Sequence, residues 1–403
     1  MRKQQLLALF LCSLVPWTIG NGMTPLLPVY AADLGASPSL AGYQLALAYL
    51  ALAAGTLSAG WLSDRLQRRK GLIVAGGLVN IPILWLMGQV TNVWALGALL
   101  AVWCFSAGMC VTLINILTGL FAEESVRGKV FGILSLNSGL GALIGGLALG
   151  PIADGWGYPA MFVVLSLFSF LWPAIGVFLK DEAVARTQGA SAMAGGEKVG
   201  LGQSFHFLFL ASLAAAFAGM VFTVGRSLVM DDLGFEAAAI STTSALSEVP
   251  ILPLPLLLGW LSDRVGRRQF LILGHLAATA GLLSLAVSTS QWHFCGATVL
   301  NTISVMTGAV GTALVADLVP QKALGKGLSL FGATTCIAGI LGCAAAGYAI
   351  QYLGPVFTFV ASALLPLVAV AFLLAIRQGS RQQESPALPL GKPSAAEPLA
   401  AGA

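Results

Sequence analysis

One stretch decides the fold: Gly60-Trp61-Leu62-Ser63-Asp64-Arg65-Leu66-Gln67-Arg68-Arg69-Lys70, which returns 199 positions later as Gly259-Trp260-Leu261-Ser262-Asp263-Arg264-Val265-Gly266-Arg267-Arg268-Gln269. Eight of the eleven positions are identical. Each copy follows a second long apolar segment and precedes a third. Because self-similarity at a fixed spacing indicates duplicated structural units, the sequence predicts two related halves.

The residue types in this stretch indicate where it lies. Gly60 and Gly259 are small residues at which two helices can touch. Asp64 and Asp263 each place a carboxylate near a helix end, and a basic cluster follows that is costly to bury in lipid. Each copy is therefore predicted to be a short loop at a membrane face.

The composition indicates an all-α integral membrane protein. Of the 403 residues, 57% are hydrophobic and only 9% are charged, whereas about a quarter of residues are charged in soluble domains. One membrane span takes about 20 residues, so the three long uncharged runs, 71–122, 269–316 and 327–376, should each hold two helices. Twelve transmembrane helices are predicted, at 6–30, 38–62, 71–90, 93–117, 128–150, 159–179, 204–228, 237–259, 268–288, 291–315, 325–350 and 355–376.

The basic residues predict the orientation. Nineteen of the 20 Lys and Arg fall in the N-terminus, the links after even-numbered helices or the C-terminal tail. The positive-inside rule then places both termini in the cytoplasm of a multi-pass protein of the plasma membrane, in bacteria the inner membrane. The exception, Arg226, is expected to snorkel to the outer interface and balance Asp231 and Asp232. The formal charge of +4 is a topology signal, and no nucleic-acid partner is expected.

The same pattern gives the domain organisation. Residues 1–179 form an N-terminal six-helix bundle and residues 204–376 a C-terminal six-helix bundle. The mixed-charge segment 180–203 is predicted to be a cytoplasmic linker, and the proline-containing segment 377–403 a disordered cytoplasmic tail.

The doubled loop also carries a family resemblance. Gly-x-x-x-Asp-Arg-x-Gly-Arg-Arg between the second and third helices, repeated between the eighth and ninth, resembles the signature loop of the major facilitator superfamily. The resemblance covers residues 6–376, and the one departure is Gln67, where the pattern has the glycine that the second copy keeps as Gly266. It implies two pseudo-symmetric six-helix bundles, each made of three-helix inverted repeats, around a central site exposed alternately to either face.

The resemblance assigns a role to the two signature loops, which are expected to latch the cytoplasmic side closed while the site faces outward. The residues expected to form this cytoplasmic gate are Gly60, Asp64, Arg65, Arg68, Arg69, Gly259, Asp263, Arg264, Arg267 and Arg268.

One carboxylate is predicted to lie in mid-membrane. Glu248 stands eleven residues before Gly259, which places it about 16 Å deep along a helix that rises about 1.5 Å per residue. A carboxylate at that depth must be protonated, paired or hydrated. Glu248 is therefore the predicted proton-coupling residue. The alternative is a permanently protonated side chain bonded to a neighbouring helix.

Polar, aromatic and Met residues in the predicted helices are candidates for lining the substrate cavity, and each is also explained by helix packing. With Glu248 as its one fixed charge, the cavity is expected to be more apolar than ionic. The candidates are Trp17, Asn21, Gln44, Tyr49, Met109, Asn115, Asn137, Phe217, Asn301 and Met306.

No enzyme, cofactor or metal site is expected. The sequence contains nothing that resembles an ATP-binding loop, a hydrolase nucleophile elbow or a metal cluster. The six cysteines lie in predicted helices without CxxC spacing, as small packing residues do. The energy source should then be an ion gradient, with protons as the coupling ion.

The first functional interpretation is proton-driven efflux, by antiport, of a small amphipathic or lipophilic compound through a monomeric transporter in the lipid bilayer. The outer loop Asp33–Ser37 and the glycine-rich segment 139–150 resemble efflux members of the superfamily. The alternative is proton-coupled import or sugar-type efflux of a polar solute. Leu246–Pro250 resembles such carriers, and Cys104 stands where efflux members carry an arginine. A more distant alternative is a non-transporting membrane sensor with the same fold, which the two well-kept signature loops disfavour.

Overall fold

The computed structural model of the chain describes residues 3–66, 68–121, 127–179, 201–249, 264–306, 308–320 and 323–376. All regular elements within these ranges are helices, as predicted. Ten described helices are long and apolar enough to cross a membrane. The predicted linker, except for residues 201–203, and the predicted tail lie outside the described residues.

The N-terminal bundle provides the first six spans. The chain crosses from the fifth to the sixth inside α6, at Gly157, whose φ of +81° interrupts the helix before Pro159. The helices of this bundle are α1 (Lys3–Met23), α2 (Leu27–Asp33), α3 (Pro38–Leu66), α4 (Arg69–Met87), α5 (Val93–Phe121), α6 (Arg127–Ser169) and α7 (Leu171–Gly176).

The C-terminal bundle provides the other six. Its α9 begins the eighth span, and α12 with α13 forms the tenth. The described helices thus include part or all of each of the twelve predicted spans; of the eighth, residues beyond 249 lie outside the described ones. Those of this bundle are α8 (Gln203–Asp232), α9 (Ala237–Glu248), α11 (Arg267–Ala286), α12 (Gln291–Met306), α13 (Gly308–Leu318), α14 (Leu324–Leu353) and α15 (Pro355–Ala375).

The first span differs from its prediction as one helix over 6–30. Helix α1 ends at Met23, a turn follows, and α2 begins at Leu27. The cause is Pro25 with Pro28, since neither has the backbone N–H that would continue the helical bonding. At the end of α1, the backbone N–H and the hydroxyl of Thr24 both donate to the Gly20 carbonyl, at 2.9 and 2.7 Å.

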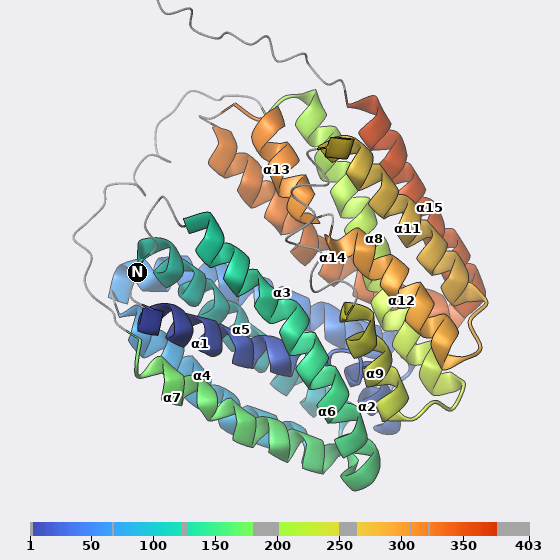
Figure 1. Cartoon of the computed structure of the whole chain (residues 1–403). Helices are drawn as coiled ribbons and strands as arrows, with labels where there is room; N and C mark the ends of the chain where they lie inside the picture. Colours follow the sequence, from blue (N-terminus) through green and yellow to red (C-terminus); the bar gives the residue numbers. More distant parts are fainter. Residues whose placement is uncertain are drawn as a thin grey trace, which may run out of the picture.

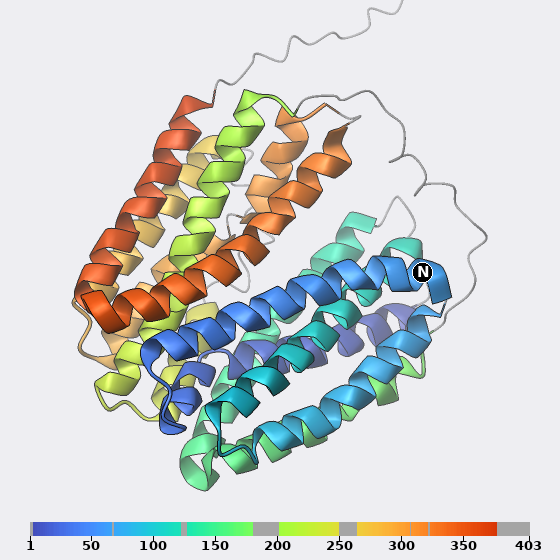
Figure 2. The ribbon, with the colours of Figure 1, turned by 180° about the vertical axis from the view of Figure 1, so that it is seen from behind.

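The two bundles lie side by side at one end of the molecule and splay apart at the other (Figures 1 and 2). We call the first the sealed end, where α2 ends at Asp33 and α8 ends at Asp232. We call the second the basic end, where α3 ends just after Arg65 and α11 begins at Arg267.

Close helix packing joins the bundles at the sealed end. A Cβ atom at Gly42 of α3 would lie 2.5 Å from the Cys343 carbonyl of α14, and one at Gly347 would lie 2.2 Å from the Pro38 carbonyl. Only glycine permits backbones to approach so closely. The larger apolar core crosses this end, from Phe162 in α6 to Phe222 and Phe359 in the C-terminal bundle.

Candidate functional site

A cavity of about 580 Å³ lies between the bundles, within the size range of small-molecule sites. The N-terminal bundle contributes its wall from α1, α3 and α6, and the C-terminal bundle contributes the larger share. The polar and ionisable residues that line it are Asn21, Thr24, Tyr49, Ser138, Ser212, Thr223, Arg226, Ser244, Glu248, His275, Thr298, Asn301, Thr302, Ser304, Thr312, Thr334 and Thr335.

Glu248 reaches this cavity from the last position of α9. Its side chain is half-buried. Among the residues that the structure describes, no cation lies within 4.0 Å of its carboxylate. The structure therefore places a carboxylate on the wall of an internal cavity, where water, a proton or a ligand can reach it.

Arg226 also lines the cavity, so the expectation that it snorkels to the outer interface is wrong. The side chain is only 4% exposed. Its Nη2 donates to the Ser244 hydroxyl at 2.6 Å and its Nη1 to the Thr298 hydroxyl at 3.2 Å. These bonds to α9 and α12 direct the guanidinium inward. The cavity thus holds a cation as well as Glu248, which corrects the expectation of a single fixed charge.

His275 of α11 is the third ionisable residue on the wall. It is 5% exposed, and its Nδ1 lies 3.5 Å from the Ser304 hydroxyl. Arg226, Glu248 and His275 all belong to the C-terminal bundle. The described part of the N-terminal bundle contributes no ionisable wall residue except Tyr49.

Three of the predicted cavity residues lie on the wall. Asn21 donates through Nδ2 to the Ser138 carbonyl at 2.9 Å, which ties α1 to α6. Tyr49 packs its ring on Gly339 of α14, across the two bundles. Asn301 is buried on the wall side of α12.

Two of the predicted polar cavity residues are used for helix packing instead. Gln44 donates through Nε2 to the Val93 carbonyl of α5 at 2.5 Å, and Asn137 donates through Nδ2 to the Phe10 carbonyl of α1 at 3.0 Å. A buried amide is strongly favoured to bond a nearby carbonyl. Neither side chain lines the cavity.

Four other predicted cavity residues also lie away from its wall. Trp17 contacts α6, Met109 packs near Gly76 of α4, and Phe217 packs beside α14. These contacts hold helices of one bundle together. Asn115 is exposed, and the side chain of Met306 lies outside the described ones.

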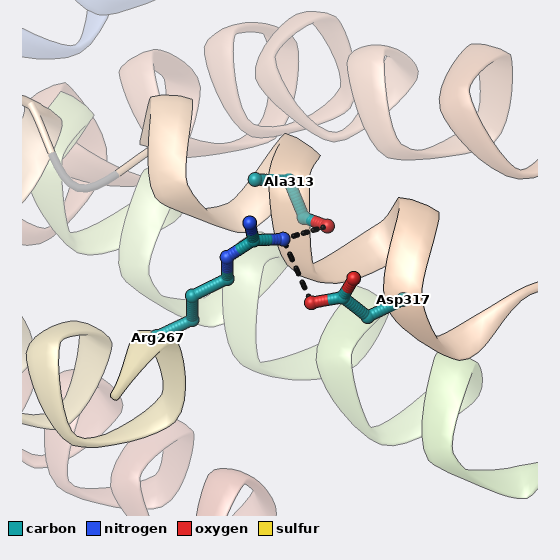
Figure 3. A network of polar contacts seen from close by, with 3 residues as sticks. All are labelled: Arg267, Ala313 and Asp317. Atoms are coloured by element: carbon teal, nitrogen blue, oxygen red, sulfur yellow. Dashed lines mark hydrogen bonds and ion pairs between the residues drawn. The ribbon is translucent and has the colours of Figure 1, made fainter. Parts of the chain in front are cut away.

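The second signature loop is bonded within the C-terminal bundle. Nη1 of Arg267 lies 2.7 Å from Oδ2 of Asp317 and donates to the Ala313 carbonyl at 3.0 Å, both on α13 (Figure 3). Arg268 donates to the carbonyls of Leu374 and Ile376 at the end of α15. The start of α11 is thereby fixed to two neighbouring helices. Arg264 is exposed, and Gly259 and Asp263 lie outside the described residues.

The first signature loop is bonded within the N-terminal bundle. Arg69 donates through Nε to the Ser63 hydroxyl at 2.7 Å, and the Arg65 guanidinium lies 5.2 Å from the centre of the Trp61 ring. Arg68 is exposed, and the side chain of Asp64 lies outside the described ones. At Gly60 an added Cβ would meet none of the described residues within 4 Å. Within the described ranges, the helix contact expected at Gly60 is therefore not made in this conformation.

Polar contacts join the two bundles at the sealed end. Asp154 of α6 accepts from the backbone N–H groups of Ala237 at 2.9 Å and Ala238 at 2.7 Å. It thereby caps the first turn of α9, to which the N-cap residue itself contributes no side-chain bond. An anion at a helix N-terminus is stabilised by the helix dipole. Asp154 thus links the bundles electrostatically.

Comparison with known proteins identifies the family. The family model described as Major Facilitator Superfamily matches residues 7–222 and again residues 207–400. The chain belongs to the major facilitator superfamily. Superfamily members of this kind are transporters and not enzymes, so the chain is a multi-pass membrane transporter.

Two relatives illustrate the similarity. The multidrug resistance protein MdtG of Dickeya zeae (strain Ech586) is 25% identical over 306 residues, which cover 72% of each chain. The tetracycline resistance protein, class B, of Escherichia coli is 30% identical over 141 residues, which cover 35% of this chain and 34% of that protein.

Solved superfamily structures share the fold. The nucleoside transporter NupG aligns with a TM-score of 0.77 at 13% identity, covering 94% of this chain and all of that one. A bacterial homolog of the human lysosomal transporter Spinster, in an inward-facing and unoccupied conformation, aligns with a TM-score of 0.73 at 16% identity, covering 93% of this chain and 97% of that one. At such identities the likeness shows the fold alone.

Proposed function

We propose that this transporter exports a small amphipathic or lipophilic organic compound across the cytoplasmic membrane in exchange for protons, as a monomer. The observation that carries the proposal is Glu248 on the wall of a cavity between the two bundles. The relatives named for multidrug and tetracycline resistance favour export and a drug-like cargo.

We propose that the conformation described here opens to the cytoplasm. The basic end, where the bundles splay apart, would be cytoplasmic by the positive-inside rule, with both termini on that side. The sealed end, joined through Asp154 and the Gly42–Gly347 contact, would face outward. Export would then begin with loading of the cavity from the cytoplasm or the inner leaflet.

Glu248 is proposed to couple this cycle to protons. Low-dielectric surroundings favour the neutral carboxyl, whereas water in an open cavity favours the carboxylate. Opening to the outside lets the residue take up a proton at the higher proton concentration. Opening to the cytoplasm lets it release that proton, so the proton gradient drives the cycle in one direction.

The signature loops are proposed to hold the basic end closed when the cavity faces outward. In the conformation described, Arg69, Arg267 and Arg268 are tied within their own bundles. These anchors position both loops for contact with the opposite bundle. The proposed gate comprises Gly60, Asp64, Arg65, Arg68, Arg69, Gly259, Asp263, Arg264, Arg267 and Arg268.

A second candidate function is proton-coupled import or efflux of a polar solute. It is favoured by the hydroxyl and amide groups on the C-terminal wall, among them Thr298, Asn301 and Thr302. Cys104, buried in α5, also leaves that bundle without the arginine that the resemblance associates with drug and proton exchange.

Transport by everted membrane vesicles distinguishes proton-driven export of a lipophilic compound from proton-coupled transport of a polar solute. With an acidic interior, the wild type should accumulate tetracycline or ethidium, and dissipation of the pH gradient should release it. Exchange against protons is contradicted if the gradient has no effect on either compound while it drives the uptake of a polar sugar.

A further inference from the structure

We infer that the cavity binds its cargo through an anionic group, and that Arg226 is the residue that recognises it. The cargo class is an amphipathic organic carboxylate. The inference deepens the proposed transport function and rests on it, although the binding site can be tested without transport.

The first argument is the position of Arg226. It lies on α8 six positions before the helix ends at Asp232, about 9 Å along the helix axis. The residue is only 4% exposed and still forms part of the cavity wall. It is therefore shielded from bulk water and aimed at the space that a ligand would fill.

The second argument is that two hydroxyls hold the guanidinium in place. Thr298 donates its hydroxyl hydrogen to the Phe294 carbonyl at 2.7 Å, and Ser244 donates to the Ile240 carbonyl at 3.5 Å. Both oxygens are thus oriented to accept from Arg226. Because side chains on two other helices supply these bonds, the cation is pre-organised before any ligand arrives.

The third argument is that these bonds leave the cation incompletely satisfied. A guanidinium has five N–H donors, and each Nη keeps one hydrogen beyond the bonds to Thr298 and Ser244. The buried Nε has no hydrogen-bond partner. Within the described ranges, no carboxylate lies within 4.0 Å of the guanidinium.

These three observations favour an anionic ligand. A buried cation without a counter-ion is unfavourable by several kcal/mol, whereas a planar carboxylate can accept two parallel bonds from a guanidinium. Met220, Leu271 and Phe331 line the same cavity and can contact the hydrophobic body of the same ligand. The wall therefore suits a molecule with one carboxylate and an apolar ring or chain.

The inference also constrains the coupling at Glu248. A bound carboxylate favours the protonated form of Glu248, since two nearby negative charges repel. Exchange against protons then requires that the cargo also carry a cationic group, which competes with the proton at Glu248. Arg226 and Glu248 together indicate a zwitterionic cargo for export, whereas a purely anionic cargo would move together with the proton.

The test uses three fluorescent probes that share one aromatic body: dansylglycine carries a carboxylate, dansylglycinamide is neutral and dansylcadaverine is cationic. Fluorescence anisotropy with the purified full-length protein at pH 7.5 measures each affinity. Dansylglycine should bind at least about tenfold more tightly than its amide. In the Arg226→Gln variant the two should bind alike, with the affinity of the amide unchanged.

Three further variants provide the controls. Arg226→Lys keeps the positive charge but loses the planar pair of donors of the guanidinium, so it should retain part of the preference for dansylglycine over its amide. Thr298→Val keeps the arginine and loses one of the bonds that position it, so it should also weaken the preference for dansylglycine over its amide. This variant still tests the inference if Arg226→Gln does not fold. Lys326→Gln removes one exposed basic residue of α14 and should change nothing.

Three outcomes overturn the inference: equal wild-type affinity for dansylglycine and its amide, no binding of dansylglycine, or an unchanged preference in Arg226→Gln. The vesicle assay separates this failure from that of the proposed function. Export of ethidium without any carboxylate preference refutes only the role of Arg226. A carboxylate preference without gradient-driven transport refutes only the proposed transport.

Discussion

The two bundles share a repeat and differ in their chemistry. Both carry the signature stretch, and both have long apolar helices in the same order. In the N-terminal bundle the buried amides of Gln44 and Asn137 bind helix backbones. In the C-terminal bundle Arg226, Glu248 and His275 line the cavity.

This difference indicates that the two bundles, although related by a repeat, contribute different groups to the cavity. The repeat gives both halves the same frame and the same kind of loop at the basic end. In the N-terminal bundle, by contrast, the described wall residues are uncharged, and amides such as those of Gln44 and Asn137 bond helix backbones within the bundle. The C-terminal bundle carries the groups proposed to respond to protons and to the ligand, Glu248 and Arg226. Substitutions on the cavity wall of the C-terminal bundle should therefore affect proton coupling, whereas substitutions in either bundle can affect the conformational change.

The largest effect is expected for Glu248→Gln, which mimics the protonated carboxyl. Gradient-driven accumulation in everted vesicles should fall to background, because the carboxylate proposed to exchange the coupling proton would then be absent. Folding should be unaffected, as judged by size-exclusion chromatography. Glu236→Gln is the matched control, since Glu236 is exposed at the other end of the same helix segment and makes no capping bond. Wild-type pH dependence in the Glu248→Gln variant would assign coupling to another residue.

A second large effect is expected for Gly60→Leu, at the basic end of α3. An added Cβ atom meets no described residue within 4 Å in the splayed conformation, so folding and ligand binding should remain. Transport should nevertheless fall by more than about tenfold, because the bundles could no longer close on the basic end. Gly296→Leu is the control, since Gly296 also lies in open space but outside the proposed gate. Normal transport by a well-expressed Gly60→Leu protein would contradict closure at this glycine.

The helical frame could be predicted from the sequence because charged residues bound the apolar runs. Arg69 begins α4 and Arg267 begins α11, close to the predicted starts. The break at Pro25 could only be predicted as a kink, since neighbouring helices decide whether a proline bends or ends a membrane helix.

The candidate site was harder to predict. In a helix that faces lipid on one side and protein on the other, both faces are apolar, so periodicity does not reveal which polar side chains point inward. The sequence therefore does not distinguish Gln44 and Asn137, which bond helix backbones, from residues that line the cavity. Asp231 and Asp232, which follow Arg226, favour an interfacial position for it that the structure does not show. The signal that could have placed it correctly is the run of Ser and Thr in 241–247, which supplies hydroxyl acceptors on a neighbouring helix.

A smaller effect is expected for Asp154→Ala, which removes the cap that the N-terminal bundle provides to α9. An exposed cap of this kind should shift the populations of the sealed and open states only several-fold. Cysteines at positions 39 and 351, where Ser39 donates to Gln351 across the bundles at 2.5 Å, should cross-link more slowly in the variant. The change in cross-linking rate should depend on the carboxylate, so Asp154→Glu, which keeps it, should change the rate less than Asp154→Ala. Identical cross-linking rates in Asp154→Ala and the wild type would exclude Asp154 as a link between the bundles.

The smallest effect is expected for Gly266→Ala, which compares the two signature loops directly. Gly266 has a φ of +95° immediately before α11, a conformation that costs a residue with a Cβ about 1–2 kcal/mol. The new methyl group would also lie 2.3 Å from the Gln269 side-chain oxygen, which can move away because it ends a flexible chain. The cost of the positive φ therefore decides whether the substitution stabilises or destabilises the protein, and the thermal unfolding midpoint of the purified protein should fall.

The matched control for this change is Gly71→Ala, just inside α4 in the N-terminal bundle. Its nearest neighbour would be the Cβ of Arg68 at 3.9 Å, and its φ is not positive. Alanine is also the better helix former, so the midpoint should stay the same or rise. Opposite shifts in the two variants would show that the glycine of the second loop is required by backbone conformation. If both variants unfold at the wild-type temperature, the left-handed turn before α11 is not a fixed feature, and the second loop could accept a side chain as the first does at Gln67.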